Sequence, residues 1–302
     1  MPILFYTLDV FTDRQFGGNQ LAVVPHADGL SDEVMLAITR EFNYSESVFV
    51  HPPSGAEYTR RLRIFTPGGE IPFAGHPTVG TAHLLAAIGE VALDGDETRM
   101  VLEEKVGPVP VTVRSTDGRP TFAQLTVAKL PEVGPPPPPR DTLAAILSLD
   151  PADILDAPYE PQAISCGVPF LLVALRDRRA VARARPRVEL FERELAGAWA
   201  SLVMIFAADP ELPGSDIRAR MFGPMIGVPE DPATGSACAT LGGYLAARTP
   251  REGTLRWVVE QGFEMGRRSI IHVEADKRGG AVSAVRVGGS SVIVSRGELL
   301  GV

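Results

Sequence analysis

One segment of this chain occurs twice, with its chemistry altered between the copies. The first copy, residues 63–82, reads R-I-F-T-P-G-G-E-I-P-F-A-G-H-P-T-V-G-T-A, and the second, residues 220–239, reads R-M-F-G-P-M-I-G-V-P-E-D-P-A-T-G-S-A-C-A. Arginine, phenylalanine and two prolines of the first copy (positions 63, 65, 67 and 72) align with the same residue types at 220, 222, 224 and 229. After one gap, residues 76–78 align with residues 232–234. A duplicated strand, turn and helix start predicts two similar domains about a pseudo-twofold axis, and the cleft between them is the expected site.

Size, charge and cysteine content narrow the class of protein. A chain of 302 residues has room for about two domains, and 45% hydrophobic with 22% charged residues is typical of a soluble globular enzyme. The net charge of −8 argues against nucleic-acid binding, which needs a basic face. No uncharged apolar run of about 18 residues predicts a membrane span, and residues 1–11 resemble a strand more than a signal peptide. Cys166 and Cys238 are too few for a disulfide framework or a zinc cluster, so a cytoplasmic protein is expected.

Hydrophobic patterns divide the chain into many strands and one prominent helix in each half. Ser31 is predicted to cap a helix that runs to Phe42, and the motif copies lead into helices at about 77–88 and ending near Ala247. Strands around one central helix in each half predict an α+β fold and not a doubly wound sheet. The strands expected in the first half are 1–11, 21–24, 47–50, 58–65, 100–113 and 121–127, and those in the second half are 163–166, 171–175, 201–207, 217–221, 254–260, 269–275, 281–287 and 290–294.

Five consecutive prolines, Pro135 to Pro139, mark the expected connection between the domains. Such a run takes polyproline II geometry and fits neither a helix nor a central strand. The sequence therefore predicts an N-terminal domain at 1–134 and a C-terminal domain at 140–302, and it leaves open whether the last strand returns to the N-terminal domain.

Glu46 is a candidate acid or base. It follows a helix and directly precedes the apolar residues 48–50, so its carboxyl group is expected to be partly desolvated, which would strengthen it as a base. An ordinary glutamate at an exposed strand edge fits the same pattern.

The helix starts of the two motif copies are candidate anion sites. Pro77 suits a first helical turn, which would leave the amides of Gly75 and His76 at a helix N-terminus with an imidazole beside them. A capping or structural role for His76 fits equally well. In the second copy, Gly235 and Ser236 could hold a carboxylate, whereas Asp231 could simply cap the helix.

Other chemistry is not indicated. The glycine pairs form neither a G-x-G-x-x-G fingerprint nor a Walker loop, so no nucleotide cofactor is implied. His83 follows His76 without an acidic partner nearby, and no metal site is expected. Cys238 is expected on the buried face of the second helix.

Four blocks, taken together, are similar to one known family. They are G-G-N-Q-L-A-V-V at 17–24, Y-S-E-S-V-F-V at 44–50, the first motif copy, and D-P-A-T-G-S-A at 231–237. In order and spacing they resemble the phenazine-biosynthesis PhzF-like isomerase/epimerase family, which has the diaminopimelate epimerase fold. The resemblance covers essentially the whole chain.

The resemblance carries expectations about fold, activity and residues. It implies two pseudo-symmetric domains, each a β-barrel-like mixed sheet wrapped around a central helix. It also implies a homodimer and cofactor-independent proton movement on a small carboxylate-bearing, anionic metabolite. Carried over by motif, the catalytic residues are Glu46, His76 and Asp231, and the substrate-binding residues are Asn19, Gly75, Gly235 and Ser236.

The resemblance also frames the alternatives. Amino-acid epimerases of this fold use one cysteine from each domain, whereas residues 75–76 and 231–232 hold no cysteine here. A single carboxylate therefore favours isomerisation. An amino-acid epimerase or racemase is the alternative enzyme, and a non-catalytic metabolite-binding protein is the alternative of another class. Arg268 departs from the family's Gly-Arg-Pro-Ser block, which leaves the shape of the pocket and the substrate open.

Overall fold

The computed structural model describes residues 2–300 and divides the chain into two compact units. Unit 1 comprises Met1–Ala128 and Val287–Val302, and unit 2 comprises Lys129–Arg286. The chain enters unit 2 before the proline run, because β9 (Glu132–Val133) already pairs with β10 (Gln162–Ser165). Among the described residues, no helix combines the length and the apolar character needed to cross a membrane.

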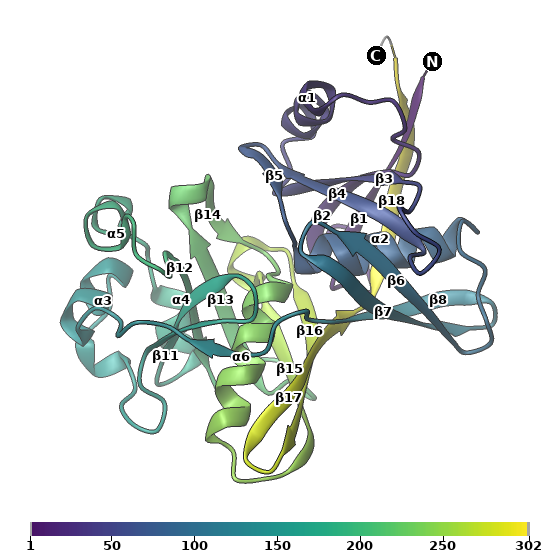
Figure 1. Ribbon diagram of the computed structural model, residues 1–302. Coiled ribbons are helices and arrows are strands. Elements are labelled where there is room, and N and C mark those ends of the chain that lie inside the picture. The colour runs from purple at the N-terminus through teal and green to yellow at the C-terminus, as the bar shows by residue number, and fades with distance from the viewer. Residues whose placement is uncertain (1, 301–302) are drawn as a thin grey trace. The chain divides into compact units, whose positions relative to one another are not determined.

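Unit 1 is an α+β body in which nine strands accompany two helices among its described residues (Figure 1). Ser31 caps the first helix as predicted, since its hydroxyl accepts a hydrogen bond from the Val34 amide at 3.3 Å. The expected strand at 100–113 is two strands, because the chain turns at Gly107, which has a φ of 116°. The elements are β1 (Ile3–Val10), β2 (Asn19–Val24), α1 (Asp32–Phe42), β3 (Glu46–His51), β4 (Arg60–Thr66), β5 (Gly69–Ile71), α2 (Gly75–Ala87), β6 (Glu97–Glu104), β7 (Gly107–Thr116), β8 (Arg119–Thr126) and β18 (Ser291–Leu299).

Unit 2 repeats this plan and adds helices that the hydrophobic pattern did not indicate. The short helices α3 (Arg140–Leu147), α4 (Arg178–Arg183) and α5 (Val188–Leu195) pack through one apolar cluster against β11 to β13. The remaining elements are η1 (Pro151–Asp153), β11 (Pro169–Ala174), β12 (Leu202–Ala207), β13 (Ile217–Gly223), η2 (Pro224–Ile226), β14 (Val228–Asp231), α6 (Gly235–Arg248), β15 (Gly253–Gln261), η3 (Phe263–Met265), β16 (Ser269–Arg278) and β17 (Ala281–Gly289), whose last residues belong to unit 1.

Strand pairing shows that the duplication extends well beyond the repeated motif. In unit 1, β2 runs parallel to β3, β3 antiparallel to β4, and β4 parallel to β6. In unit 2 the same order holds for β11, β12, β13 and β15. The last strand of each half of the sequence belongs to the other unit. Strand β9 follows β8 of unit 1 but pairs with β10 of unit 2, and β18 follows β17 but pairs with β1 of unit 1. The two units therefore share one topology.

The structural register corrects one detail of the sequence alignment. The helices of the two motif copies begin at Gly75 and Gly235, so His76 corresponds to Ser236 and not to Pro232. The displacement arises because the turn η2 inserts extra residues between β13 and β14, whereas β4 and β5 are joined by a tight turn.

Each unit is built around its buried motif helix (Figure 1). All residues of α2 from Gly75 to Ala86 are buried, and the helix contacts β1, β2, β7 and β8. In unit 2, α6 contacts β10, β11, β15 and β16. Small residues allow this close approach: a Cβ atom on Gly80 would lie 2.6 Å from Val10 Cγ2, and one on Gly242 would lie 2.5 Å from Val273 Cγ1. Helices that are apolar all round are stable only when fully covered.

Candidate active site

Unit 1 brings four of the predicted site residues together at the start of α2. Asn19 begins β2 and Glu46 begins β3, two parallel neighbours in which Leu21 pairs with Glu46. The side chain of Asn19 reaches His76, with 3.3 Å between Nδ2 and Nδ1. On the other side of the ring, His76 Nε2 lies 3.5 Å from Glu46 Oε2. Gly75 precedes His76 as the first residue of the helix.

His76 is neutral in this setting. The residue is 3% exposed, and burial lowers the pKa of its imidazole to about 3. The 3.5 Å contact with Glu46 is therefore not an ion pair at neutral pH. A neutral imidazole can take part in one donated and one accepted hydrogen bond, and it does not cancel the charge of a neighbouring carboxylate.

Glu46 lies between the interior of unit 1 and its surface. Its side chain is 18% exposed, while Val48 and Phe49, which follow it in β3, are completely buried. The carboxyl group is thus largely desolvated and yet accessible to a small molecule at the surface of the unit. The partial desolvation expected from the sequence is present. The role of Glu46 as an acid or base stays a prediction, since the same pattern fits an ordinary strand-edge glutamate.

The N-terminus of α2 lacks a side-chain cap. Ala74 is the N-cap residue and has no side chain that could accept from the first-turn amides, and the first turn contains no acidic residue. The helix dipole and the unsatisfied N–H groups favour an anion at such a position.

Unit 2 places the other predicted residues at the start of α6. Asp231 ends β14, and its Oδ2 accepts a hydrogen bond from the hydroxyl of Thr234 at 2.5 Å. Because the Thr234 side chain is directed to Asp231, the helix again begins without a side-chain cap and without an acid in its first turn. Gly235 is buried and Ser236 is half-buried. The two groups of residues belong to different units.

Sequence reasoning missed Gln261, the last residue of β15. Its side chain is completely buried and binds the segment that leads into α6. Nε2 donates to the backbone oxygen of Asp231 at 2.8 Å and to Thr234 Oγ1 at 2.9 Å, and Oε1 accepts from the Thr234 amide at 3.0 Å. Nearby, the Ser269 hydroxyl donates to the backbone oxygen of Pro232 at 2.8 Å. Pairings of this kind join distant segments and leave no periodic signal in the sequence.

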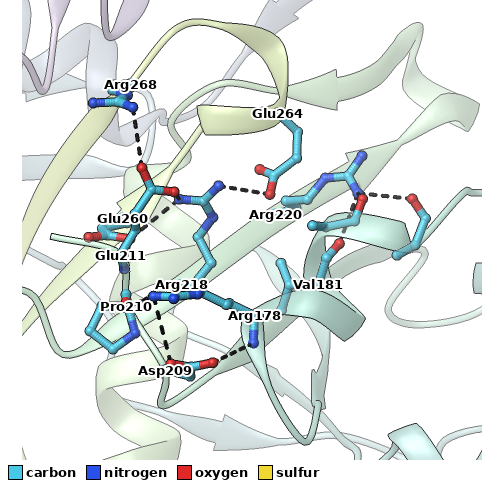
Figure 2. A network of polar contacts seen from close by, with 12 residues as sticks. Arg178, Val181, Asp209, Pro210, Glu211, Arg218, Arg220, Glu260, Glu264 and Arg268 are labelled. Carbon is cyan, nitrogen blue, oxygen red and sulfur yellow. Dashed lines mark hydrogen bonds and ion pairs between the residues drawn. The ribbon is translucent and has the colours of Figure 1, made fainter.

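The duplicated arginines anchor the hairpins that precede the two helices. Arg63 binds both carboxylate oxygens of Glu70 at 2.9 Å, and Arg220 binds those of Glu230 at 2.7 and 2.8 Å. Figure 2 shows Arg220 also reaching the backbone of Val181. Bidentate pairs of this type fix orientation as well as contributing energy. These arginines therefore position the helix starts and do not belong to the candidate site itself.

Arg268, the departure from the family pattern, lies in a second ionic network of unit 2 (Figure 2). Its guanidinium donates to Glu211 at 3.2 Å and lies 5.0 Å from the ring centroid of Phe263. In the same network, Arg218 binds Glu264 at 2.8 Å and contacts the buried carboxylate of Glu260 at 3.4 Å. Within unit 2, the Arg268 side chain is thus engaged with Glu211 and Phe263 and not with Asp231 or Ser236.

Neither cysteine is suited to act as a thiolate. Cys166 and Cys238 are both buried. Burial raises the pKa of the Cys166 thiol to about 12 and also raises that of Cys238. The geometry gives no support to a mechanism that uses two opposed thiols.

Comparison with known proteins agrees with the fold and the motifs. The family model for "Phenazine biosynthesis-like protein" (PhzC-PhzF) matches residues 8–297. An uncharacterized isomerase, mll1393 of Mesorhizobium japonicum, is 39% identical over 296 residues and covers 96% of each chain. The trans-2,3-dihydro-3-hydroxyanthranilate isomerase of Pseudomonas aeruginosa is 32% identical, with 97% of this chain and 98% of that protein covered.

Solved structures give the same result. A phenazine biosynthesis protein of the PhzF family from Bacillus anthracis superimposes with a TM-score of 0.89 at 25% identity and covers 99% of both chains. A probable proline racemase from Agrobacterium radiobacter K84 shares the fold, with a TM-score of 0.64 at 14% identity. The expected fold class, an α+β fold of the epimerase type, is confirmed.

Proposed function

Because this chain belongs to the phenazine biosynthesis-like (PhzC-PhzF) family and is an isomerase by its full-length relatives, we propose that it moves a proton on a small carboxylate-bearing metabolite without a cofactor. Glu46 is the proposed acid and base. The observation that carries this assignment is its position 3.5 Å from the neutral, buried His76, beside the uncapped start of α2.

In the proposed reaction, the Glu46 carboxylate removes a proton from one carbon of an unsaturated substrate. The electron pair of that C–H bond forms a new double bond, and the electron pair of the existing double bond takes up a proton at a different carbon. Glu46 delivers this proton after its carboxyl group, which is 18% exposed, has exchanged its proton with water. Substrate and product have the same atoms and the same oxidation level, so no redox partner is required. General acid–base catalysis of this type contributes roughly 10²- to 10⁴-fold.

The other predicted residues hold the substrate in this proposal. The amides at Gly75 and His76 in unit 1, and at Gly235 and Ser236 in unit 2, offer two helix N-termini for anionic groups. Asn19 supports the His76 ring through the 3.3 Å contact, and Asp231 is the polar partner from unit 2. We also propose that the protein forms a homodimer.

The relative in Pseudomonas aeruginosa supports a proposal for the substrate class. Its name specifies trans-2,3-dihydro-3-hydroxyanthranilate, an unsaturated ring that carries a carboxylate. We propose that the present protein acts on a compound of this type. The buried thiols with raised pKa values argue against a two-cysteine amino-acid epimerase.

Turnover and binding measured together test the proposal. With trans-2,3-dihydro-3-hydroxyanthranilate as the probe, Glu46→Gln is expected to lower kcat at least about 100-fold while Kd from calorimetry changes less than about threefold. Glu41→Gln, an exposed glutamate on α1, is the matched control and should behave as the wild type. A Glu46→Gln enzyme with wild-type kcat would refute Glu46 as the base, whereas a wild-type protein that does not bind the probe would refute the substrate class.

A further inference from the structure

The shared topology makes Glu104 and Gln261 equivalent residues. In unit 1, Arg61 pairs with Glu103 between β4 and β6, and in unit 2 Arg218 pairs with Glu260 between β13 and β15. Glu104 and Gln261 are the next residues and end their strands. Both are buried, Glu104 at 5% and Gln261 at 0% exposure. Each directs its side chain to the start of the central helix of its unit.

In unit 2 the contacts fix the orientation of the Gln261 amide. A backbone oxygen can only accept and a backbone N–H can only donate, so Nε2 must face the Asp231 oxygen and Oε1 must face the Thr234 amide. The second N–H of Nε2 is then donated to Thr234 Oγ1. Because this oxygen already accepts from Gln261, the single hydroxyl proton of Thr234 is directed to Asp231 Oδ2, 2.5 Å away.

This chain of hydrogen bonds links Gln261 to a residue of the proposed site. One end is the Gln261 amide, the middle is the Thr234 hydroxyl, and the other end is one carboxylate oxygen of Asp231. The strand that carries Gln261 is itself held, because the neighbouring Glu260 accepts from the amides of Glu211 and Leu212 at 2.9 and 2.6 Å. Asp231 is therefore oriented from the interior of unit 2.

In unit 1 the geometry indicates that Glu104 is protonated. Thr78 Oγ1 lies 2.7 Å from the Ala74 backbone oxygen and 2.6 Å from Glu104 Oε1. The hydroxyl has one proton, and the Ala74 oxygen can only accept it, so the short contact with Glu104 is satisfied when the carboxylic acid donates. Glu104 Oε2 has no hydrogen-bond partner among the described residues, which an ionised carboxylate could not tolerate when buried. Burial raises the pKa of Glu104 to about 8, in agreement with a neutral acid.

We propose that Glu104 and Gln261 are a matched pair of positioning residues, which hold the starts of α2 and α6 through Thr78 and through Thr234 with Asp231. Glu104 does so as a neutral acid that donates a proton as the amide of Gln261 does. Neither residue contacts the substrate. The proposal rests on the proposed function, since it assigns these residues to the same site, and its tests separate the two.

Amide hydrogen exchange tests the contact without any substrate. In Gln261→Leu the Thr234 amide loses its acceptor, so its exchange, followed by NMR, should be at least about tenfold faster than in the wild type. Gln162→Leu is the matched control, because the Gln162 side chain accepts a hydrogen bond from Arg248, away from Thr234 but in the same unit. Unchanged Thr234 exchange in Gln261→Leu would overturn the proposal, even if the protein proved to have a different activity.

A kinetic cycle tests positioning as distinct from folding. Gln261→Leu and Thr234→Val are each expected to lower kcat roughly 10- to 100-fold with KM changed less than about threefold, because a misplaced group costs rate more than binding. The double variant should lose no more than the worse single variant, since both act through one chain to Asp231. Additive losses, or a fall in folded population that accounts for the rates, would contradict positioning.

A conservative variant tests the neutral acid in unit 1. Glu104→Leu removes the donor to Thr78 and should lower kcat, whereas Glu104→Gln supplies an N–H donor and should restore most of that loss. In the infrared difference spectrum of wild type minus Glu104→Gln at pH 6.5, a protonated carboxylic acid band is expected. A carboxylate band, or a Glu104→Gln variant as impaired as Glu104→Leu, would overturn the assignment of a protonated Glu104.

Discussion

The Nε2 atom of His76 lies 3.5 Å from Oε2 of Glu46, yet the two are not an ion pair, because burial keeps the imidazole neutral. A carboxylate that faces an imidazolium would be stabilised and would be a weaker base. A neutral ring does not stabilise the carboxylate in this way, and it remains able to orient a substrate. This relationship leads to the first prediction.

His76 should not titrate in the physiological range. Its pKa of about 3 predicts that the ring resonances stay constant between pH 5 and 8 in NMR spectra of ¹⁵N-histidine-labelled protein. His26, which is exposed and contacts Glu90 at 3.3 Å, provides an internal comparison. A midpoint between pH 6 and 7 for His76 would show that the ring is charged and that the contact with Glu46 is an ion pair.

Glu104 should make the protein less stable as the pH rises. Between the ordinary pKa of 4.5 and the native value of about 8, the folded state keeps a proton that the unfolded state has released. The free energy of unfolding therefore falls with pH in this window, by at most about 1.4 kcal/mol for each unit.

Glu104→Gln removes that dependence. Burial lowers the pKa of His76 and of His83, to about 4 for the latter, and so raises stability with pH up to about 6.5 in both proteins. The difference between the variant and the wild type isolates Glu104. Urea unfolding at pH 5, 6.5 and 8 should show the variant gaining relative stability with pH, and a constant difference would contradict a raised pKa.

Gly262 should be far more sensitive to substitution than its neighbour Gly266. Alanine would be strained at both positions, because φ is positive, 75° at Gly262 and 70° at Gly266. A Cβ atom at Gly262 would lie 2.3 Å from the Arg267 oxygen and 2.5 Å from the Pro232 oxygen, whereas one at Gly266 would meet nothing within 4 Å. Gly262→Ala is expected to lower the free energy of unfolding by about 1–3 kcal/mol more than Gly266→Ala. Equal losses in denaturant titrations would mean that this loop does not pack closely against the Asp231 segment.

Arg220 should be essential to the stability of unit 2. It is 4% exposed, binds both carboxylate oxygens of Glu230 and donates to the backbone oxygens of Val181 and Ala184. Arg220→Met leaves Glu230 and these oxygens without their donor, and an expected loss of about 3–5 kcal/mol follows. Arg193→Met, which breaks an exposed pair with Glu194, should cost about 0–1 kcal/mol. Similar losses in the two variants would contradict a structural role for the buried pair.

Much of the fold could be predicted from local patterns. The duplicated motif, the Ser31 cap and the small-residue helices mark elements that depend on neighbouring residues, and the structure contains them. The helices α3, α4 and α5 span only six to eight residues and follow no long period, so the pattern did not reveal them. The register between the motif copies was displaced because a turn such as η2 is invisible to periodicity.

The candidate site was predictable to a different degree. The pattern alone allowed ordinary roles for Glu46 and His76, and their selection came from the family resemblance. Their 3.5 Å approach depends on the parallel pairing of β2 with β3 and on the packing of α2, which are long-range contacts. The contacts of Gln261 are also long-range. Its partners Asp231 and Thr234 precede it by 30 and 27 residues and do not belong to its strand.

The most direct test of the account is the transfer of solvent deuterium. In D₂O, the wild-type enzyme acting on trans-2,3-dihydro-3-hydroxyanthranilate should release product with deuterium at one ring carbon, detected by NMR and mass spectrometry. Glu46→Gln should still bind the probe but should incorporate no deuterium above the uncatalysed rate. Incorporation by Glu46→Gln at the wild-type rate would contradict the central claim that Glu46 carries the proton.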